Sequence, residues 1–244
     1  MDTTREANDP LVPSLRKHVL EPLSTAERAV EEERTEVNAE QKAYTEFKQR
    51  VAGIETVTMP ADGPGPAART PVVETRSRQD ERLRNAFRQT VMSVDHYEAV
   101  YGEPLEEHAA CELSAEVAAP LRQDTTTRFT ELYKTALTSA VEDAVSDREA
   151  FCDRLDDELA SLVSARESLA DRIDTIDGTS VFAHDRPELS AELDAVAQAR
   201  QETIQGRNHS PRADGHDLCH YLYRDYSWTY PVLTAVTRFR NATV

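Results

Sequence analysis

Two seven-residue repeats between Val141 and Ile176 constrain this chain more than any other feature. Their alternating spacing of three and four residues places a narrow apolar stripe on one α-helix, as in a coiled coil or a long bundle helix. Because one helix cannot bury its own stripe, a second helix must pack along it. The repeats consist of Val141, Arg148, Leu155, Leu162, Leu169 and Ile176 and of Val145, Cys152, Leu159, Arg166 and Ile173.

A second helix with the same periodicity is predicted over residues 14–55, with Ser24 and Glu27 forming a capping box. Its stripe contains carboxylates, whereas Arg148 and Arg166 lie in the other stripe. We therefore expect the two helices to pack together, with a pair such as Glu40 and Arg148 setting their register. The predicted core residues are Leu155, Leu159, Leu162, Leu169 and Ile173 on one helix and Val37, Tyr44, Phe47 and Val51 on the other.

The remaining sequence completes an all-α architecture, an elongated helical bundle with long coiled-coil-like helices and no sheet. Residues 1–13 are expected to form a flexible tail, and prolines and glycines in residues 56–78 indicate a linker or long loop. Residues 79–244 are expected to form a helical bundle that ends in an aromatic-rich segment. Within it, one helix is predicted to run from Gln79 to about Tyr101, and another from Pro104 to Leu121.

The charge balance favours adaptation to molar salt. The chain has 45 acidic and 28 basic residues, for a net charge of -17, and only four of the basic residues are lysines. Excess carboxylates spread along a chain keep it hydrated where salt screens repulsion, whereas an acidic protein built for a basic partner would concentrate its charge in one block. The sequence shows no signal peptide and no apolar run of roughly 20 residues, so a cytoplasmic protein with three reduced cysteines is expected.

A possible metal site lies near the C-terminus, where His216, Cys219 and His220 follow one another at helical spacing. Imidazole and thiolate ligands suit zinc, and the Asp217-x-x-His220 spacing is one that helical bundles present to iron. The alternative is that these side chains pack beside the neighbouring tyrosines, because a single motif of this type often occurs by chance.

Other polar residues give weaker indications of chemistry. Histidine can act as a general acid or base, and His96, within Asp95-His96-Tyr97, and His108 are candidates for that role. Such residues more often cap or pack at helix ends. No nucleophile elbow, metalloprotease motif or glycine-rich phosphate loop is present. The chain has only seven glycines, which is few for a loop that binds phosphate through its backbone. The sequence therefore predicts no catalytic residue and no cofactor.

One basic stretch carries six arginines between Arg69 and Arg88. An arginine-rich stretch of this kind can bind an acidic protein or nucleic acid. However, the global charge opposes polyanion binding, and high salt weakens phosphate contacts. A solvated helix start is the favoured interpretation.

Several segments resemble a family of helical, coiled-coil-containing proteins from salt-loving archaea. They are Phe87–Tyr97, Glu32–Arg34, Tyr221–Tyr223 and Tyr230–Leu233. The resemblance covers most of the chain beyond the first dozen residues and outside the linker. It implies a helical protein without an assigned activity, so no functional residue is transferred.

Together these features predict a non-enzymatic, cytoplasmic structural or protein–protein interaction module. Its partner would be another protein or a second copy, as a possible homodimer, bound through the helix stripes. The alternative is a helical-bundle metal-binding enzyme or sensor that uses His216, Cys219 and His220.

Overall fold

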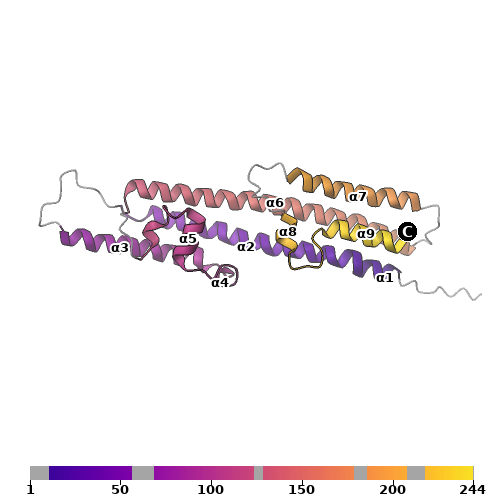
Figure 1. Cartoon of the computed structure of the whole chain (residues 1–244), viewed down its shortest axis with the longest axis horizontal. Coiled ribbons are helices and arrows are strands. Elements are labelled where there is room, and N and C mark those ends of the chain that lie inside the picture. Colours follow the sequence, from indigo (N-terminus) through magenta and orange to yellow (C-terminus); the bar gives the residue numbers. More distant parts are fainter. Residues whose placement is uncertain (1–10, 57–68, 124–128, 179–185, 208–217, 244) are drawn as a thin grey trace, which may run out of the picture. The chain divides into compact units, whose positions relative to one another are not determined.

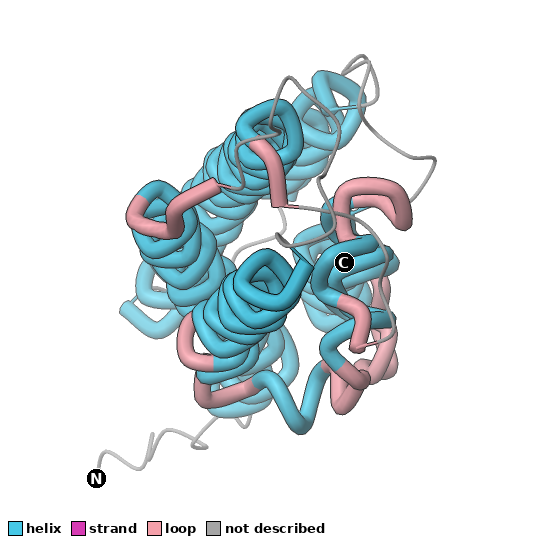
Figure 2. Tube along the Cα trace, turned by 90° about the vertical axis from the view of Figure 1, so that its left-hand side faces the viewer, coloured by secondary structure: helices cyan, strands magenta, loops and turns pink. Residues whose placement is uncertain are grey.

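A computed structural model of the chain describes residues 11–56, 69–123, 129–178, 186–207 and 218–243, and in residues 69–77, 177–178, 186 and 207 it describes the backbone alone. Within these ranges every regular element is a helix and no strand occurs, which confirms the all-α class (Figure 2). None of the described helices combines the length and the apolar character needed to cross a membrane.

The helices vary widely in length, and α6 alone contains 48 residues (Figure 1). The α-helices are α1 (Leu11–Leu15), α2 (Glu21–Ala52), α3 (Arg69–Arg88), α4 (Tyr97–Val100), α5 (Leu105–Leu113), α6 (Glu131–Gly178), α7 (Arg186–Arg207), α8 (Leu218–Tyr223) and α9 (Pro231–Thr243). A π-helical turn η1 (Arg16–Leu20) and two 3₁₀ turns, η2 (Val91–Ser93) and η3 (Ala119–Leu121), complete the described elements.

The chain forms two compact units. Unit 1 comprises residues 1–34 and 153–244, and unit 2 comprises residues 35–152. Both α2 and α6 contribute one part of their length to each unit.

In unit 2, α2 and α6 are antiparallel neighbours. Lys48 pairs with Glu142 at 2.7 Å between Nζ and Oε1, and Arg148 pairs with Glu40 at 2.8 Å between Nε and Oε2. As the numbers fall along α2 they rise along α6, which defines the antiparallel direction. The predicted stripe of α2 is buried here, since Val37, Tyr44, Phe47 and Val51 are at most 6% exposed. The pair of helices and the Glu40–Arg148 contact that were predicted from the sequence are both present.

The core of unit 2 is completed by helices that cover this pair. Leu83 and Phe87 from α3 and Leu105, Ala109 and Leu113 from α5 join the buried cluster. The ring of Phe87 meets Phe47 edge to face, with 5.1 Å between the ring centroids. The unit therefore has one continuous apolar centre built from α2, α3, α5 and α6.

In unit 1, the same antiparallel pairing is seen, and α7, α8 and α9 are added. Arg166 donates to Glu27 at 2.7 Å from Nε to Oε1, and Arg34 pairs with Asp156 at 2.6 Å. Val30, Leu155, Leu162, Leu169 and Ile173 are fully buried. The helix α9 contacts η1 and α7 and contributes Val232, Ala235, Val236 and Phe239 to the core.

The register of α6 in unit 1 differs from the prediction at one step. Leu159 is only half-buried, whereas Glu158 is 0% exposed. The buried face here follows Leu155, Glu158, Leu162 and Ala165, so the companion row lies one residue earlier than the apolar pattern indicated. A charged residue took the place of an apolar one because it has a buried cationic partner, described below.

Three predicted helix boundaries also differ. The helix expected to continue to Tyr101 ends at Arg88, and Thr90 leaves the helical region with φ -123° and ψ -81°. The helix expected to reach Leu121 ends at Leu113, where Ser114 takes a φ of 74°. At the other end of α3, the helix begins at Arg69, inside the range predicted as linker.

Candidate functional site

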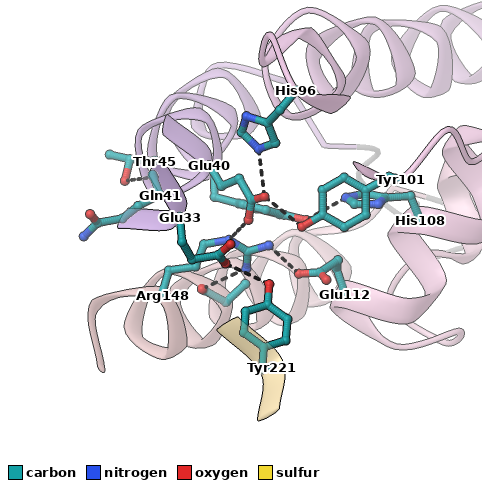
Figure 3. A network of polar contacts seen from close by, with 12 residues as sticks. Glu33, Glu40, Gln41, Thr45, His96, Tyr101, His108, Glu112, Arg148 and Tyr221 are labelled. Atoms are coloured by element: carbon teal, nitrogen blue, oxygen red, sulfur yellow. Dashed lines mark hydrogen bonds and ion pairs between the residues drawn. The ribbon is translucent and has the colours of Figure 1, made fainter. Parts of the chain in front are cut away.

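Unit 2 holds a buried polar cluster centred on Glu40, which we call the Glu40 cluster (Figure 3). Its carboxylate accepts hydrogen bonds from Nε of Arg148 at 2.8 Å and from the hydroxyl of Tyr101 at 2.7 Å. Nε2 of His96 lies 3.0 Å from Oε1 of the same carboxylate. The side chains of Glu40, His96 and Arg148 are only 11–12% exposed, so the contacts are formed largely away from water.

Arg148 links this carboxylate to a second one. Its Nη2 donates to Oε2 of Glu112 at 2.8 Å, its Nη1 donates to Ala144 O at 3.2 Å, and its Cζ lies 4.4 Å from the ring centroid of Tyr44. Burial opposes the charged form of Glu40, but the positive charge of Arg148 and the hydrogen bonds to the carboxylate outweigh it, so the pKa of Glu40 is lowered. Both charges are therefore retained inside the unit.

His108 lies beside this cluster within a set of aromatic rings. Its centroid is 4.7 Å from that of Tyr101 and 5.1 Å from that of Tyr97, and its Nε2 lies 3.3 Å from the hydroxyl of Tyr44. Burial lowers the pKa of His108 below its ordinary value of 6.5. The ring is consequently neutral near pH 7 and acts as a packed hydrogen-bonding group.

Unit 1 holds a second buried cluster, the Arg200 cluster, formed by α6, α7 and α8. Nη1 and Nη2 of Arg200 donate to the two carboxylate oxygens of Glu158 at 2.7 and 2.8 Å, and Nη2 also donates to Sγ of Cys219 at 3.2 Å. The hydroxyl of Tyr223 donates to Oε1 of Glu158 at 2.6 Å. Arg200 and Glu158 are 1% and 0% exposed, so this pair is fully removed from water.

The electrostatics of the Arg200 cluster favour the charged pair and the neutral phenol. Burial raises the pKa of Tyr223, and the negative charge of Glu158 raises it further. Burial alone would lower the pKa of Arg200, but the hydrogen bonds and charge of Glu158 raise it. Arg200 therefore stays charged and Tyr223 stays neutral near pH 7.

The aromatic-rich end of unit 1 is partly exposed. The rings of Tyr226 and Trp228 stack with centroids 4.6 Å apart and an angle of 14° between their planes, and Tyr226 is 38% exposed. Tyr221 is 46% exposed and donates to Oε1 of Glu33 at 2.8 Å. Trp228 also packs against the buried Tyr223, so the exposed ring of Tyr226 is connected to the core of unit 1 through Trp228. We refer to residues 221–230 as the aromatic segment.

A family model described as a domain of unknown function (DUF7260) matches residues 21–243. The chain belongs to the DUF7260 family. No curated protein and no solved structure matches it. The DUF7260 range begins at the first residue of α2 and ends at the last residue of α9, so it contains both buried clusters and the aromatic segment.

The structure of this DUF7260 protein describes two of the three predicted metal ligands. His216 lies outside the described residues. Cys219 is buried and accepts a hydrogen bond from Arg200, while His220 is exposed on α8 with its ring beside Tyr230. Among the residues that the structure describes, no three His, Cys, Asp or Glu side chains group as metal ligands. The metal site at His216, Cys219 and His220 stays a prediction.

The two other histidines singled out in the sequence lie near each other in the structure. His96 and His108, for which packing at a helix end was favoured over an acid or base role, both lie beside Glu40 or its partners. Glu158 and Arg200 were not predicted from the sequence. The available signals were the three-residue step from Leu155 to Glu158 with the four-residue step to Leu162, and the seven-residue spacing from Leu193 to Arg200.

Proposed function

We propose that this DUF7260 protein is a non-enzymatic, cytoplasmic interaction module of a cell with molar internal salt, and that it binds a protein partner through the aromatic segment. The observation that carries the proposal is the exposed ring of Tyr226, which stacks on the half-buried Trp228, itself packed against the buried Tyr223. Tyrosine and tryptophan contribute much of the binding energy in protein interfaces, because they bury large rigid areas at little cost in side-chain entropy.

The buried charged groups support a structural role for the clusters. In the Glu40 cluster, the carboxylates of Glu40 and Glu112 both bind the guanidinium of Arg148. Oε1 of Glu40 also contacts His96 and Tyr101. In the Arg200 cluster, the carboxylate oxygens of Glu158 are bound by Arg200 and Tyr223. Such closed networks fix the register of neighbouring helices, and polar seam residues serve this purpose in helical assemblies.

The location of the helix stripes argues against a homodimer closed through them. Leu155, Leu162 and Leu169 are 0% exposed within a single chain, as are Tyr44 and Phe47. A second copy would have to displace helices that are already packed. A partner is therefore expected on another surface, and the aromatic segment provides exposed rings of the appropriate type.

The composition supports the proposed salt environment. The net charge of -17 is reached with only four lysines, which leaves the surface rich in strongly hydrated carboxylates. At molar salt, exposed charges beyond roughly 3 Å are screened, so apolar and aromatic contacts gain in relative importance for binding.

The test is affinity capture in multi-molar KCl with the wild-type chain and a Tyr226→Ser/Trp228→Ala variant as baits. We expect at least one protein to be retained by the wild type and lost with the variant, as measured by quantitative mass spectrometry. The matched control is Leu132→Ala, which removes an 82% exposed side chain from unit 2 and should retain that protein. Identical retention by all three baits would reject the aromatic segment as the binding surface.

A further inference from the structure

The helix α3 carries a group of exposed arginines. Arg78, Arg82 and Arg88 are all exposed, and Glu81 is the only exposed carboxylate between them. Within the described part of the chain, none of the three arginines forms an ion pair. Three guanidinium groups of α3 are therefore available to a molecule outside the chain.

Two of these arginines lie on one face of a well-anchored helix. Arg78 and Arg82 are four residues apart, so their side chains leave α3 on the same side. On another side of the same helix, Leu83 and Phe87 are fully buried in the core of unit 2. The Arg78–Arg82 face is thus presented by a helix whose orientation within unit 2 is fixed.

The charge of the chain indicates what kind of partner this face fits. The net charge is -17, so a face with three uncompensated arginines differs in sign from the chain as a whole. A second copy of the chain is consequently an anionic partner for it. Opposite charges on two surfaces favour their association and fix the orientation in which they meet.

The aromatic segment offers such arginines both rings and carboxylates. Tyr226 is 38% exposed, and the side chain of the adjacent Asp225 is 84% exposed. Asp225 pairs with Arg224 at 3.4 Å, but this contact is at the surface and a second guanidinium can compete with it. Tyr221 is 46% exposed and is bound to the carboxylate of Glu33.

Arginine is the cation that suits this surface in molar salt. Its guanidinium is planar and weakly hydrated, stacks on the face of a tyrosine ring and binds carboxylates through two N–H groups. These interactions act at contact distance. They persist at molar salt, whereas attraction between distant charges is screened.

We propose that the partner of the aromatic segment is a second copy of this chain, in which Arg78 and Arg82 of α3 stack on Tyr226 and pair with Asp225. This inference rests on the proposed function, because it names the partner of the same segment. The contact joins two different surfaces, so it is heterologous. Two chains that have each lost a different one of the surfaces still form one complete contact.

The first measurement is molar mass by light scattering over a concentration series in multi-molar KCl. The mass of the wild type should rise with concentration to that of two or more chains. Arg78→Glu/Arg82→Glu and Tyr226→Ser/Trp228→Ala should each keep the mass of one chain at every concentration. The first variant removes the α3 face and the second removes the aromatic rings.

Two further variants serve as controls. Arg28→Glu/Lys42→Glu makes the same change of charge at two exposed positions of α2, and it should associate as the wild type does. Tyr226→Ser alone keeps the test valid if the loss of Trp228 disturbs folding, because Tyr226 is exposed. It should weaken association as the double change does.

The decisive measurement mixes the two defective variants. An equimolar mixture of Arg78→Glu/Arg82→Glu with Tyr226→Ser/Trp228→Ala should form a complex with the mass of two chains and no larger species. Trp228 is the only tryptophan of the chain, so the tryptophan fluorescence of the mixture comes from the arginine variant alone. That fluorescence should change saturably as the tryptophan-free variant is added.

Four outcomes would overturn the inference. They are a wild-type mass that stays at one chain, a mixture that stays monomeric, an arginine variant that associates as the wild type does, and association that nuclease treatment abolishes. The last would assign the arginines to a nucleic acid. The proposed function fails separately, when affinity capture retains the same proteins with and without the aromatic rings.

Discussion

The Glu40 cluster and the Arg200 cluster each stabilise a buried arginine, but with different partners and at different exposure. Arg148 is shared by two carboxylates and a tyrosine ring, and its side chain keeps 11% exposure. Arg200 pairs with one carboxylate among the described residues and is 1% exposed. The difference shows that a buried cation can be stabilised either by surplus negative charge near water or by one well-formed bidentate pair without water.

The difference predicts that the Arg200 cluster tolerates less change. Glu158→Ala leaves a buried guanidinium without its carboxylate, so we expect the free energy of unfolding to fall by about 3–5 kcal/mol. Denaturant unfolding in multi-molar KCl measures this change. The control is Glu202→Ala, which removes an exposed carboxylate from α7 and should have little effect. A loss no larger than that of the control would show that Arg200 readily finds another partner.

The apolar residues beside Glu158 test the corrected register of α6. Leu162 is 0% exposed, so Leu162→Ala should lower the free energy of unfolding by about 2–5 kcal/mol. Leu159 is half-buried, so Leu159→Ala should cost clearly less. Equal losses in the two variants would support the register predicted from the heptads and contradict the structure.

The Glu40 cluster should lose less when one carboxylate is removed. Glu40→Ala leaves Glu112 on Arg148, so we expect a loss of about 1–3 kcal/mol, the cost of a buried group left partly unsatisfied. The double charge reversal, Glu40→Arg with Arg148→Glu, should recover only part of the sum of the single losses, because the carboxylate introduced on α6 would face Glu112. A double-mutant cycle measures this coupling, and strict additivity of the two single changes would contradict a direct Glu40–Arg148 interaction.

Acid should affect the Glu40 cluster before the Arg200 cluster. The pKa of His108 is lowered from 6.5 in the folded state, so its contribution to stability is complete above that value and is lost as pH falls toward the folded pKa. The lowered pKa of Glu40 adds a further loss below 4.5. The charged groups that act on His108 are Glu112, Glu103, Arg148 and Glu40.

Unfolding measured between about pH 4 and 8 should therefore show a slope that His108→Gln reduces. Tyr223→Phe in the Arg200 cluster is the matched change, and it should leave the slope unaltered because burial and Glu158 raise the pKa of Tyr223 far from this range. A slope that survives His108→Gln unchanged would place the acid sensitivity elsewhere.

Metal content is expected to show the smallest effect. Cys219 is already bound by Arg200, so protein purified without chelator should contain no stoichiometric zinc or iron, and His220→Ala should leave its composition unchanged. Elemental analysis decides the question. One metal per chain that His220→Ala removes would instead support the predicted site at His216, Cys219 and His220.

The sequence was informative where charge and heptad position coincided. Glu40 and Arg148 both lie in predicted stripes, so their pairing followed from the antiparallel packing of two long helices. Glu158 and Arg200 were not predictable in this way. Arg200 follows Leu193 by seven residues, but Glu158 lies outside both heptad rows of α6. Only the tertiary placement of α7 against α6 brings them together.

A change of backbone conformation marks the misplaced helix ends. Apolar spacing continues past Arg88, but Thr90 leaves the helical region with φ -123° and ψ -81°, and Ser114 takes a φ of 74°. Apolar periodicity does not encode backbone angles at single residues. The sequence also did not indicate which rings of the aromatic segment remain exposed.

The division of α2 and α6 between two units has a consequence for synthesis of the chain. Unit 2 is one continuous segment, residues 35–152, whereas unit 1 needs residues 1–34 together with residues 153–244. On the ribosome, the first segment of unit 1 must wait while the whole of unit 2 is made, a delay on the order of ten seconds. During that interval Val19, Leu23 and Val30 have no partner helix to cover them, so the nascent chain presents an apolar helix face that a chaperone can bind.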